Sequence, residues 1–196
     1  MTRWLTMVSM VLLTGCFGSS PQLVYYALEG DAKVTPTHPR SPAKLVVTRF
    51  EVRAQYDRPE LMYRKNEREL RFYPFDLWAS KPGRMMAEAV TQHLRKAGLF
   101  TAVAMQTVTG GADYELRGEV ITLEELDLGE RDWRAHLAMR FELVRLDDGA
   151  VVMRYAFDEQ RPVPERKVAA VADKLDEILG DELIKVTQLI AEALPR

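Results

Sequence analysis

Apolar and polar residues alternate most regularly in the second half of the chain. From 133 to 143 every second residue is apolar, which is the period of a strand with one buried face. A hairpin turn follows at 147–149, and the alternation resumes in the same phase at 151–157. The strand before this pair begins at Tyr114 and changes phase after Val120, which indicates a bulge. These three segments predict an antiparallel meander.

Two other segments repeat their apolar residues with the period of a helix. The first, Lys81–Ala97, follows Ser80 as its expected N-cap and ends before Gly98, a residue type favoured just after a helix. The second, Pro164–Leu194, is longer and carries Gly180 inside its apolar stripe. Both helices are predicted to pack one apolar face against a sheet.

Shorter segments rich in β-branched and aromatic residues predict further strands in the rest of the chain. They lie at 22–28, 45–54, 61–65, 69–73 and 100–105. The stretch at 29–44, with its three prolines, is predicted to be a loop within the domain. The order is therefore strands, helix, strand, meander, helix. It predicts a single α/β domain, in which about two helices pack on a mixed, mostly antiparallel sheet.

Composition narrows the classes of protein that remain. The 196 residues are 47% hydrophobic and 29% charged, which is ordinary for a globular domain. A formal net charge of −2 gives no reason to expect nucleic acid as a partner. The single cysteine excludes an intramolecular disulfide, and a structural zinc site is not expected from one cysteine and three scattered histidines.

The N-terminus carries the clearest functional signal. Residues 4–13 form an uncharged, mostly apolar run after Arg3, which is too short to span a bilayer and is typical of an export signal. Leu13-Thr14-Gly15-Cys16 is similar to the lipobox of bacterial lipoproteins, in which the chain is cut before the cysteine and lipid is attached to its thiol. We therefore predict cleavage between Gly15 and Cys16 and acylation of Cys16. The alternatives are a free cysteine in an ordinary signal peptide or in a buried N-terminal helix.

This interpretation divides the chain into three parts. They are a lipoprotein signal peptide at 1–15, the acylated cysteine with a short tether at 16–21, and one α/β domain at 22–196. The tether reaches less than ~20 Å when extended, so the domain is expected close to the membrane surface. Phe17 follows the cysteine where an aspartate retains enterobacterial lipoproteins at the inner membrane. Attachment to the outer membrane, facing the periplasm, is therefore predicted.

Catalytic chemistry finds little support in the sequence. There is no G-x-S-x-G, Walker or dinucleotide-binding motif. The histidines are scattered, with His38 in the proline-rich loop, His93 beside a helix stripe and His136 on the polar face of a strand. The acidic pair Glu124-Glu125 is interpreted as a strand end. No enzymatic activity, metal or cofactor is predicted.

A succession of short segments is similar to the ABC-type transport auxiliary lipoprotein family, which includes the lipoprotein of the paraquat-inducible operon. The segments are YYAL at 25–28, YDRPELMYR at 56–64, DLW at 76–78 and ADYELRGEV at 112–120. The resemblance covers nearly all of the mature chain, and the lipobox and DRPELMYR are its most specific pieces. It implies an anticodon-binding-like α/β fold. It also implies that the protein is an auxiliary component of an ABC or MCE-type transport system. Such systems move phospholipids or other hydrophobic molecules across the envelope.

The resemblance implies partners as well. They are the membrane, through the acyl chains, MCE-domain or ABC transporter components, and further copies of the chain in a homo-oligomeric ring. Within DRPELMYR, Pro59 forces Arg58 toward extended conformations, and tyrosine and arginine are frequent at binding hot spots. The residues predicted to mark a contact surface are Tyr56, Arg58, Tyr63, Arg64 and Trp78. A strand with one buried face behind a proline-anchored loop explains the same pattern, so both interpretations stay open.

Two functions follow from these observations. The first is a non-catalytic lipoprotein that anchors or caps the outer-membrane end of a periplasmic transport machine. The second is a lipid- or ligand-binding lipoprotein, acting as a shuttle or as an outer-membrane assembly subunit, which needs an apolar cavity between helix and sheet. A third class, an envelope hydrolase, has no catalytic constellation in its favour.

Overall fold

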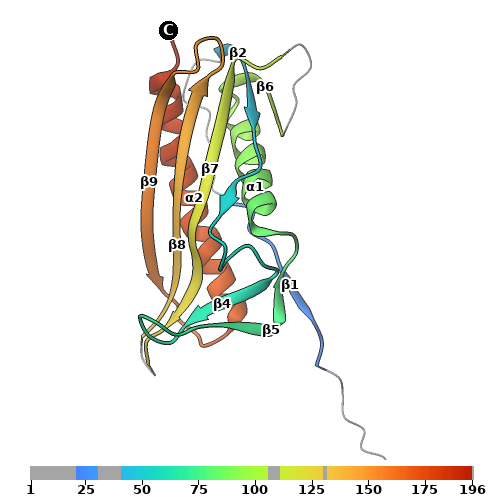
Figure 1. Ribbon diagram of the computed structural model, residues 1–196, viewed down its shortest axis with the longest axis vertical. Coiled ribbons are helices and arrows are strands. Elements are labelled where there is room, and N and C mark those ends of the chain that lie inside the picture. The colour runs from blue at the N-terminus through green and yellow to red at the C-terminus, as the bar shows by residue number, and fades with distance from the viewer. Residues whose placement is uncertain (1–20, 31–40, 106–110, 130–131, 196) are drawn as a thin grey trace, which may run out of the picture.

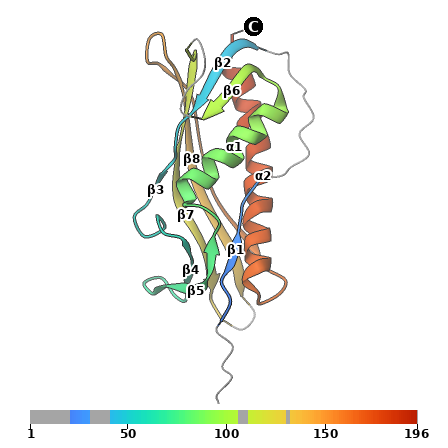
Figure 2. The same ribbon diagram turned by 90° about the vertical axis from the view of Figure 1, so that its right-hand side faces the viewer.

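The computed structural model describes residues 21–30, 41–105, 111–129 and 132–195. In this part of the chain nine strands form one mixed sheet, and the two helices cover one of its faces (Figures 1 and 2). The predicted class, a single α/β domain with about two helices on a mixed sheet, is confirmed. The predicted signal peptide and the tether up to residue 20 lie outside the described residues.

The elements follow one another in the predicted order of strands, helix, strand, meander and helix. The strands are β1 (Val24–Tyr26), β2 (Ser41–Val47), β3 (Glu51–Val52), β4 (Glu60–Arg64), β5 (Leu70–Trp78), β6 (Phe100–Met105), β7 (Tyr114–Asp127), β8 (Trp133–Arg145) and β9 (Val151–Pro162). The helices are α1 (Pro82–Ala97) and α2 (Val168–Ala193).

The meander of β7, β8 and β9 is the longest part of the sheet and is antiparallel throughout. The predicted phase change is present as a register shift between Val120 and Thr122. The predicted inward-facing residues of β8 from 135 to 143 are buried. Period-two alternation therefore predicted both the strands and the face that they bury.

The N-terminal strands extend this meander through shorter pairings. β2 lies between β6 and β7 and runs parallel to both. β4 runs parallel to β7 and forms a hairpin with β5. β1 pairs in parallel with β5 and lies at the edge of the sheet. The sheet is therefore antiparallel along its long strands and mostly parallel where the short N-terminal strands join it.

The prediction of one continuous strand at 45–54 is wrong. β2 begins inside the predicted loop and ends at Val47, and β3 follows after a gap. Within this gap the Phe50 ring packs against Gly118 of β7, where an added Cβ would lie only 2.3 Å from Cε2 of the ring. Burial of this ring, which is 2% exposed, competes with continuous strand pairing and divides the strand.

The first helix has the predicted end but a different cap. Lys81, not Ser80, is the N-cap of α1, and it makes no side-chain capping hydrogen bond. Pro82 occupies the first turn, where its missing N–H has no helical partner to lose. Gly98 adopts the left-handed conformation at φ 68° and ends the helix as predicted.

The second helix begins at Val168 rather than at Pro164. The chain before it still belongs to the sheet, because Val163 N donates a hydrogen bond to Trp133 O at 2.8 Å. Its buried stripe includes one charged residue, Glu182, which is 1% exposed. The hydroxyl of Tyr155 and the ammonium of Lys185 each donate to Glu182 at 2.6 Å, so this carboxylate has partners.

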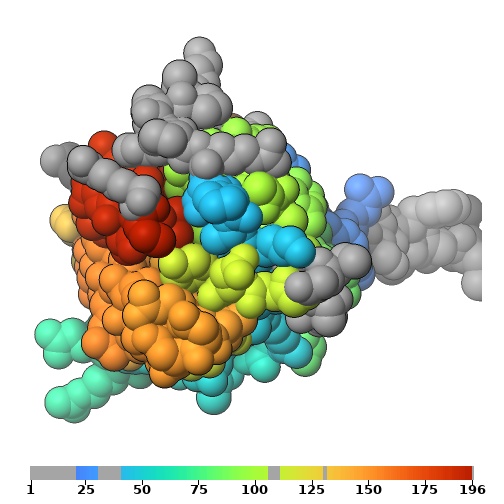
Figure 3. Space-filling view, turned by 90° about the horizontal axis from the view of Figure 1, so that it is seen from above, coloured from blue at the N-terminus to red at the C-terminus, as the bar shows by residue number. Residues whose placement is uncertain are grey.

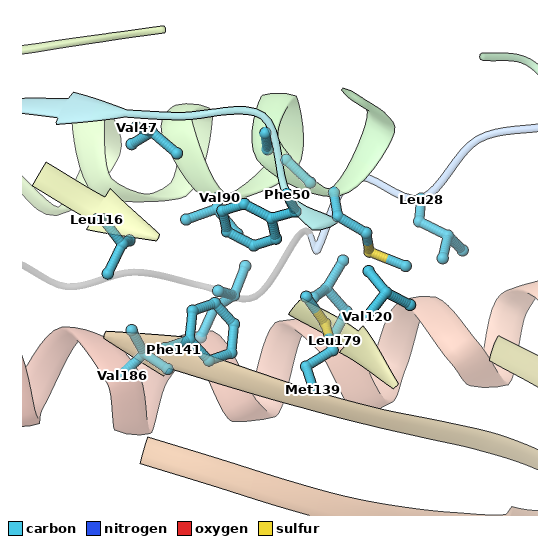
Figure 4. Packing of buried hydrophobic residues seen from close by; sticks show 14 of the residues in the cluster. Leu28, Val47, Phe50, Val90, Leu116, Val120, Met139, Phe141, Leu179 and Val186 are labelled. Carbon is cyan, nitrogen blue, oxygen red and sulfur yellow. The ribbon is translucent and has the colours of Figure 1, made fainter. Parts of the chain in front are cut away.

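Side chains fill the space between the helices and the sheet (Figure 4). The rings of Phe50 and Phe141 meet edge to face with 5.7 Å between their centroids. Val90 of α1 and Leu179 of α2 pack into the same cluster. One continuous core therefore joins both helices to the sheet.

The two ends of the long axis are built from different elements. β1, the β4–β5 hairpin, the end of β7 and the start of β8 lie at the lower end in Figures 1 and 2. The opposite end, seen from above in Figure 3, carries the last turns of α2 and the turn between β8 and β9. The first described residues therefore join the domain at the lower end.

Candidate partner-contact site

The five residues predicted to mark a contact surface gather around β4 and the end of β5, but at different depths. Tyr56 and Trp78 are buried, at 2% and 3% exposed. Arg58, Tyr63 and Arg64 are partly exposed. The contact surface itself stays a prediction, and Tyr56 and Trp78 are too deeply buried for a partner to touch them directly.

The proline-anchored loop before β4 is held by backbone hydrogen bonds. Tyr56 N donates to Arg53 O at 2.8 Å, and Trp78 N donates to Pro59 O at 2.6 Å. Proline has no N–H to donate to a strand ladder, so its position just before a strand is a favourable one. The bond from Trp78 ties this loop to the end of β5.

On the face of the sheet away from the helices, Arg64 reaches a buried carboxylate. Its Nε and Nη2 donate to Oε1 and Oε2 of Glu124 at 2.7 Å and 2.9 Å, a two-point ion pair. The hydroxyl of Tyr56 donates to Oε2 of the same residue at 2.6 Å. Burial acts to raise the pKa of Glu124, but its contacts with His136, Arg64 and Tyr56 outweigh burial and hold that pKa below its ordinary value.

His136 extends this cluster across β8 to β9. Its Nε2 lies 2.6 Å from Oδ1 of Asp158, and its Nδ1 lies 3.5 Å from Oε1 of Glu124. The longer contact lacks the geometry of a hydrogen bond, and it is an ion pair only when the imidazole is protonated. Burial acts to lower the pKa of His136, but the two carboxylates outweigh it, so the pKa is raised. The Glu124 carboxylate of β7 thus contacts β4, β8 and the loop before β4, and His136 extends these contacts to β9.

Glu125, the next residue along β7, points to the opposite face and has fewer partners. It is 1% exposed, and the hydroxyl of Tyr73 donates to its two oxygens at 3.0 Å and 2.9 Å. The Tyr73 ring in turn packs on that of Tyr63, with 4.6 Å between their centroids. Burial, partly offset by the Tyr73 hydrogen bond, raises the pKa of Glu125 to about 7.

Three neighbouring residues at the surface, two partly exposed and one exposed, form a group that we call the Arg58 surface: Arg58, Glu60 and Phe72. Arg58 Nε donates to Glu60 Oε2 at 2.9 Å. The guanidinium carbon of Arg58 lies 4.3 Å from the centroid of the Phe72 ring, in a cation–π contact. Phe72 is 46% exposed. An arginine held over an exposed aromatic ring has the composition of a binding hot spot.

Sequence reasoning missed Glu124 and His136 as members of this site. It interpreted them as a strand end and as a solvated strand face, whereas the structure pairs Glu124 with Arg64 and places His136 beside Glu124. One signal was available. Adjacent residues of a strand point to opposite faces, so two successive glutamates within a central strand place a carboxylate on each face.

Two hollows lie on the described surface. One of about 420 Å³ lies around Gly118 on the polar face of β7, and most of its lining residues are charged. The other, of about 630 Å³, lies between residues 27–29 and α1. Within the described ranges no group of His, Cys, Asp or Glu is placed to hold a metal ion. None of the helices in those ranges is long and apolar enough to cross a membrane.

The predicted lipidation site lies outside the described residues. Cleavage between Gly15 and Cys16 and acylation of Cys16 therefore stay predictions. β1 is the first described element that follows them in the chain.

Comparison with known proteins shows the family. Residues 26–183 match the model of the ABC-type transport auxiliary lipoprotein component family, and the chain belongs to that family. It is accordingly a lipid-anchored protein of the cell envelope and an auxiliary component of a transport system. Among curated protein sequences, none matches the chain.

Two crystal structures share the fold. One, of a protein from Xanthomonas campestris, is 24% identical with a TM-score of 0.75, and the match covers 86% of this chain and 96% of that one. The other, of an uncharacterized protein, is 16% identical with a TM-score of 0.69 and covers 86% of this chain and 99% of that one. The same single-domain arrangement is thus found in proteins of quite different sequence.

Proposed function

We propose that this chain is a non-catalytic lipoprotein that anchors or caps the periplasmic part of an ABC- or MCE-type transport system at the outer membrane. The family match over residues 26–183 is the observation that carries this proposal. Phe17 in place of an aspartate supports the outer membrane. The proposed cargo is phospholipid or another hydrophobic molecule, handled by the partner proteins.

The Arg58 surface is the proposed contact with an MCE-domain or ABC transporter component. Arg64 is less suited to direct contact, because it is already paired with a carboxylate that is 3% exposed. Its role, and that of Tyr56, is to hold β4 on the sheet so that the Arg58 surface is presented in one geometry. A ring of identical copies would provide a cap, and the mass of the detergent-extracted protein measures the number of copies.

Co-purification tests this contact. Arg58→Glu reverses one partly exposed charge and places two acids side by side, so we expect the transport partner to be lost. Arg154→Glu is the control, because Arg154 is a surface arginine that is likewise paired with a glutamate, Glu142, at 2.9 Å. Loss with the first variant and retention with the second supports the proposal. Equal retention of an MCE-domain partner by both variants contradicts the contact surface, and repeated absence of any transport component contradicts the function.

The anchor has a separate test. Cys16→Ser should leave the fold intact, abolish incorporation of labelled palmitate and release or mislocalise the protein. A Cys16→Ser chain that still fractionates with the outer membrane would show that the domain is held there by other contacts.

The alternative of a lipid shuttle is less well supported by the structure. It needs an apolar cavity between helix and sheet, and in the described part of the chain that space holds the packed core. Native mass spectrometry of the delipidated protein would reveal a bound lipid if this alternative were right.

A further inference from the structure

Exposed apolar side chains are concentrated at one end of the domain. Eight large hydrophobic residues are exposed in the described ranges, and six of them come from β1 and the residue before it, from β5 and from the turn after β7: Leu23, Val24, Tyr25, Phe72, Phe75 and Leu128. These elements lie at the lower end in Figures 1 and 2. The other two, Leu146 and Ile184, lie in the β8–β9 turn and on α2.

We propose that this end of the domain lies against the lipid bilayer, with Leu23, Tyr25, Phe75 and Leu128 entering the interfacial region. We call these four residues the membrane-contact patch. The proposal rests on the proposed function, because it takes Cys16 to be acylated. It goes further by naming the face of the domain that touches lipid. Phe72 is left out, because Arg58 covers its ring.

Chain length is the first argument. Seven peptide units separate Cys16 from Leu23, and an extended chain of that length reaches at most ~25 Å. A domain of this size has a radius of gyration of about 16 Å. The tether therefore keeps Leu23 within about 25 Å of the membrane, a distance shorter than the domain is wide, so the surface nearest to the tether is the one that can reach the lipid.

The patch is also fixed relative to the rest of the domain. β1 is in register with β5, with Val24 opposite Asp76 and Tyr25 opposite Leu77, so Leu23 lies beside Phe75. After β1, the backbone N–H groups of Glu29 and Gly30 donate to Oδ1 of Asp176 on α2, at 2.6 Å and 2.7 Å. An orientation imposed at the patch is therefore imposed on the sheet and on α2.

The chemistry of the patch fits an interface. Aromatic and aliphatic side chains favour the boundary between headgroups and acyl chains, where a tyrosine can keep its hydroxyl in water. Tyr25 is 60% exposed and Leu23 is 52% exposed, so in water both remain largely hydrated. Contact with lipid removes this apolar area from water.

An environment-sensitive fluorophore placed on single cysteines tests the proposal. The chain has one cysteine, whose thiol the acyl chain would occupy, so Leu23→Cys, Phe75→Cys and Leu128→Cys each offer one free thiol. Leu146→Cys is the matched control, an exposed leucine in a turn at the opposite end. The acylated full-length variants are placed in vesicles of phosphatidylethanolamine and phosphatidylglycerol, with and without a nitroxide on the lipid acyl chains.

We expect a blue shift and loss of most of the fluorescence to the nitroxide at the three patch positions, with neither at the control. Patch probes that stay as exposed as the control, in protein that is acylated and floats with the vesicles, overturn the inference and leave the proposed function standing. A blue shift without nitroxide quenching shows that protein covers the patch, and it also overturns the inference. Absence of labelled palmitate at Cys16 overturns both. Leu128→Cys lies in a turn and replaces either strand variant if that variant fails to fold.

Discussion

Glu124 and Glu125 are neighbours in sequence and almost equally buried, at 3% and 1% exposed. Their surroundings nevertheless shift the pKa values of the two carboxyl groups in opposite directions. Glu124 accepts two hydrogen bonds from Arg64 and one from Tyr56. Glu125 accepts hydrogen bonds from the hydroxyl of Tyr73. The pKa of the first is lowered, and the pKa of the second is raised to about 7.

The comparison shows that burial alone does not decide the charge of a carboxyl group. Removal from water acts in the same direction on both residues. The difference comes from a guanidinium that forms a two-point ion pair on one face of β7 and an uncharged hydroxyl on the other. One face therefore carries a buried ion pair that holds β4 in place, and the other carries a carboxyl group that is protonated below about pH 7.

The largest expected effect on stability comes from removing the guanidinium of Arg64, which forms the ion pair with Glu124. Arg64→Met leaves a carboxylate buried without its ion-pair partner, which should lower the free energy of unfolding by about 3 kcal/mol. Arg58→Met is the control, because the Arg58–Glu60 pair is more exposed and should cost less than ~1 kcal/mol. Urea unfolding of both variants at neutral pH measures the difference. Equal costs would mean that the Glu124 pair does not stabilise the fold.

Glu125→Gln should raise the free energy of unfolding at neutral and alkaline pH, whereas Arg64→Met lowers it. A carboxyl group whose folded-state pKa is raised stabilises the fold fully below its unfolded pKa, and this contribution is lost as pH rises through the folded pKa. A rise from 4.5 to about 7 corresponds to a loss of about 3 kcal/mol.

The glutamine variant avoids this loss, so it should match the natural protein near pH 4 and exceed its stability above pH 7. Urea unfolding at several pH values checks this. A stability difference that does not change with pH would contradict the assignment.

A smaller effect is expected from the two tyrosine hydroxyls. Tyr73→Phe removes the hydroxyl that bonds Glu125 and should cost about 1–3 kcal/mol at pH 8, where that carboxyl is ionised. Tyr56→Phe leaves the two bonds from Arg64 to Glu124 and should cost about 1 kcal/mol or less. Thermal unfolding of the pair at one pH gives the comparison. A larger loss of stability for Tyr56→Phe than for Tyr73→Phe would mean that Glu124, and not Glu125, depends more on its tyrosine hydroxyl.

The smallest effect concerns His136. Its pKa is raised, so its charged form stabilises the fold below the ordinary histidine pKa of about 6.5, and this contribution is lost as pH rises through the folded value. His136→Gln should therefore cost about 1 kcal/mol or less at pH 5 and still less at pH 8. If the cost is greater at pH 8, the imidazole stabilises the cluster in its neutral form.

Much of the fold could be predicted because its signals are local. The alternation in β8, the bulge after Val120 and the glycine that ends α1 each depend on a few neighbouring residues. The division of the strand at 45–54 could not be predicted. It depends on Phe50 finding space over Gly118, which is far away in sequence.

The candidate site divides in the same way. The segment from Tyr56 to Arg64 could be singled out from its residue types, but not the depth of each side chain. Tyr56 is buried because the loop before β4 folds against β7, and that contact spans 68 residues of sequence.

By itself, the sequence determined the order of the elements, and it was enough to predict the lipid anchor and to show the family resemblance. Periodicity, helix caps and short motifs each depend only on residues that are close together in the sequence. Only the tertiary structure decided that β4 runs parallel to β7 and that Arg64 meets Glu124. It also decided that exposed apolar side chains collect at the end of the domain where β1 begins. The physical reason is that charge pairing and burial depend on distances between strands, and these distances exist only once the sheet has formed.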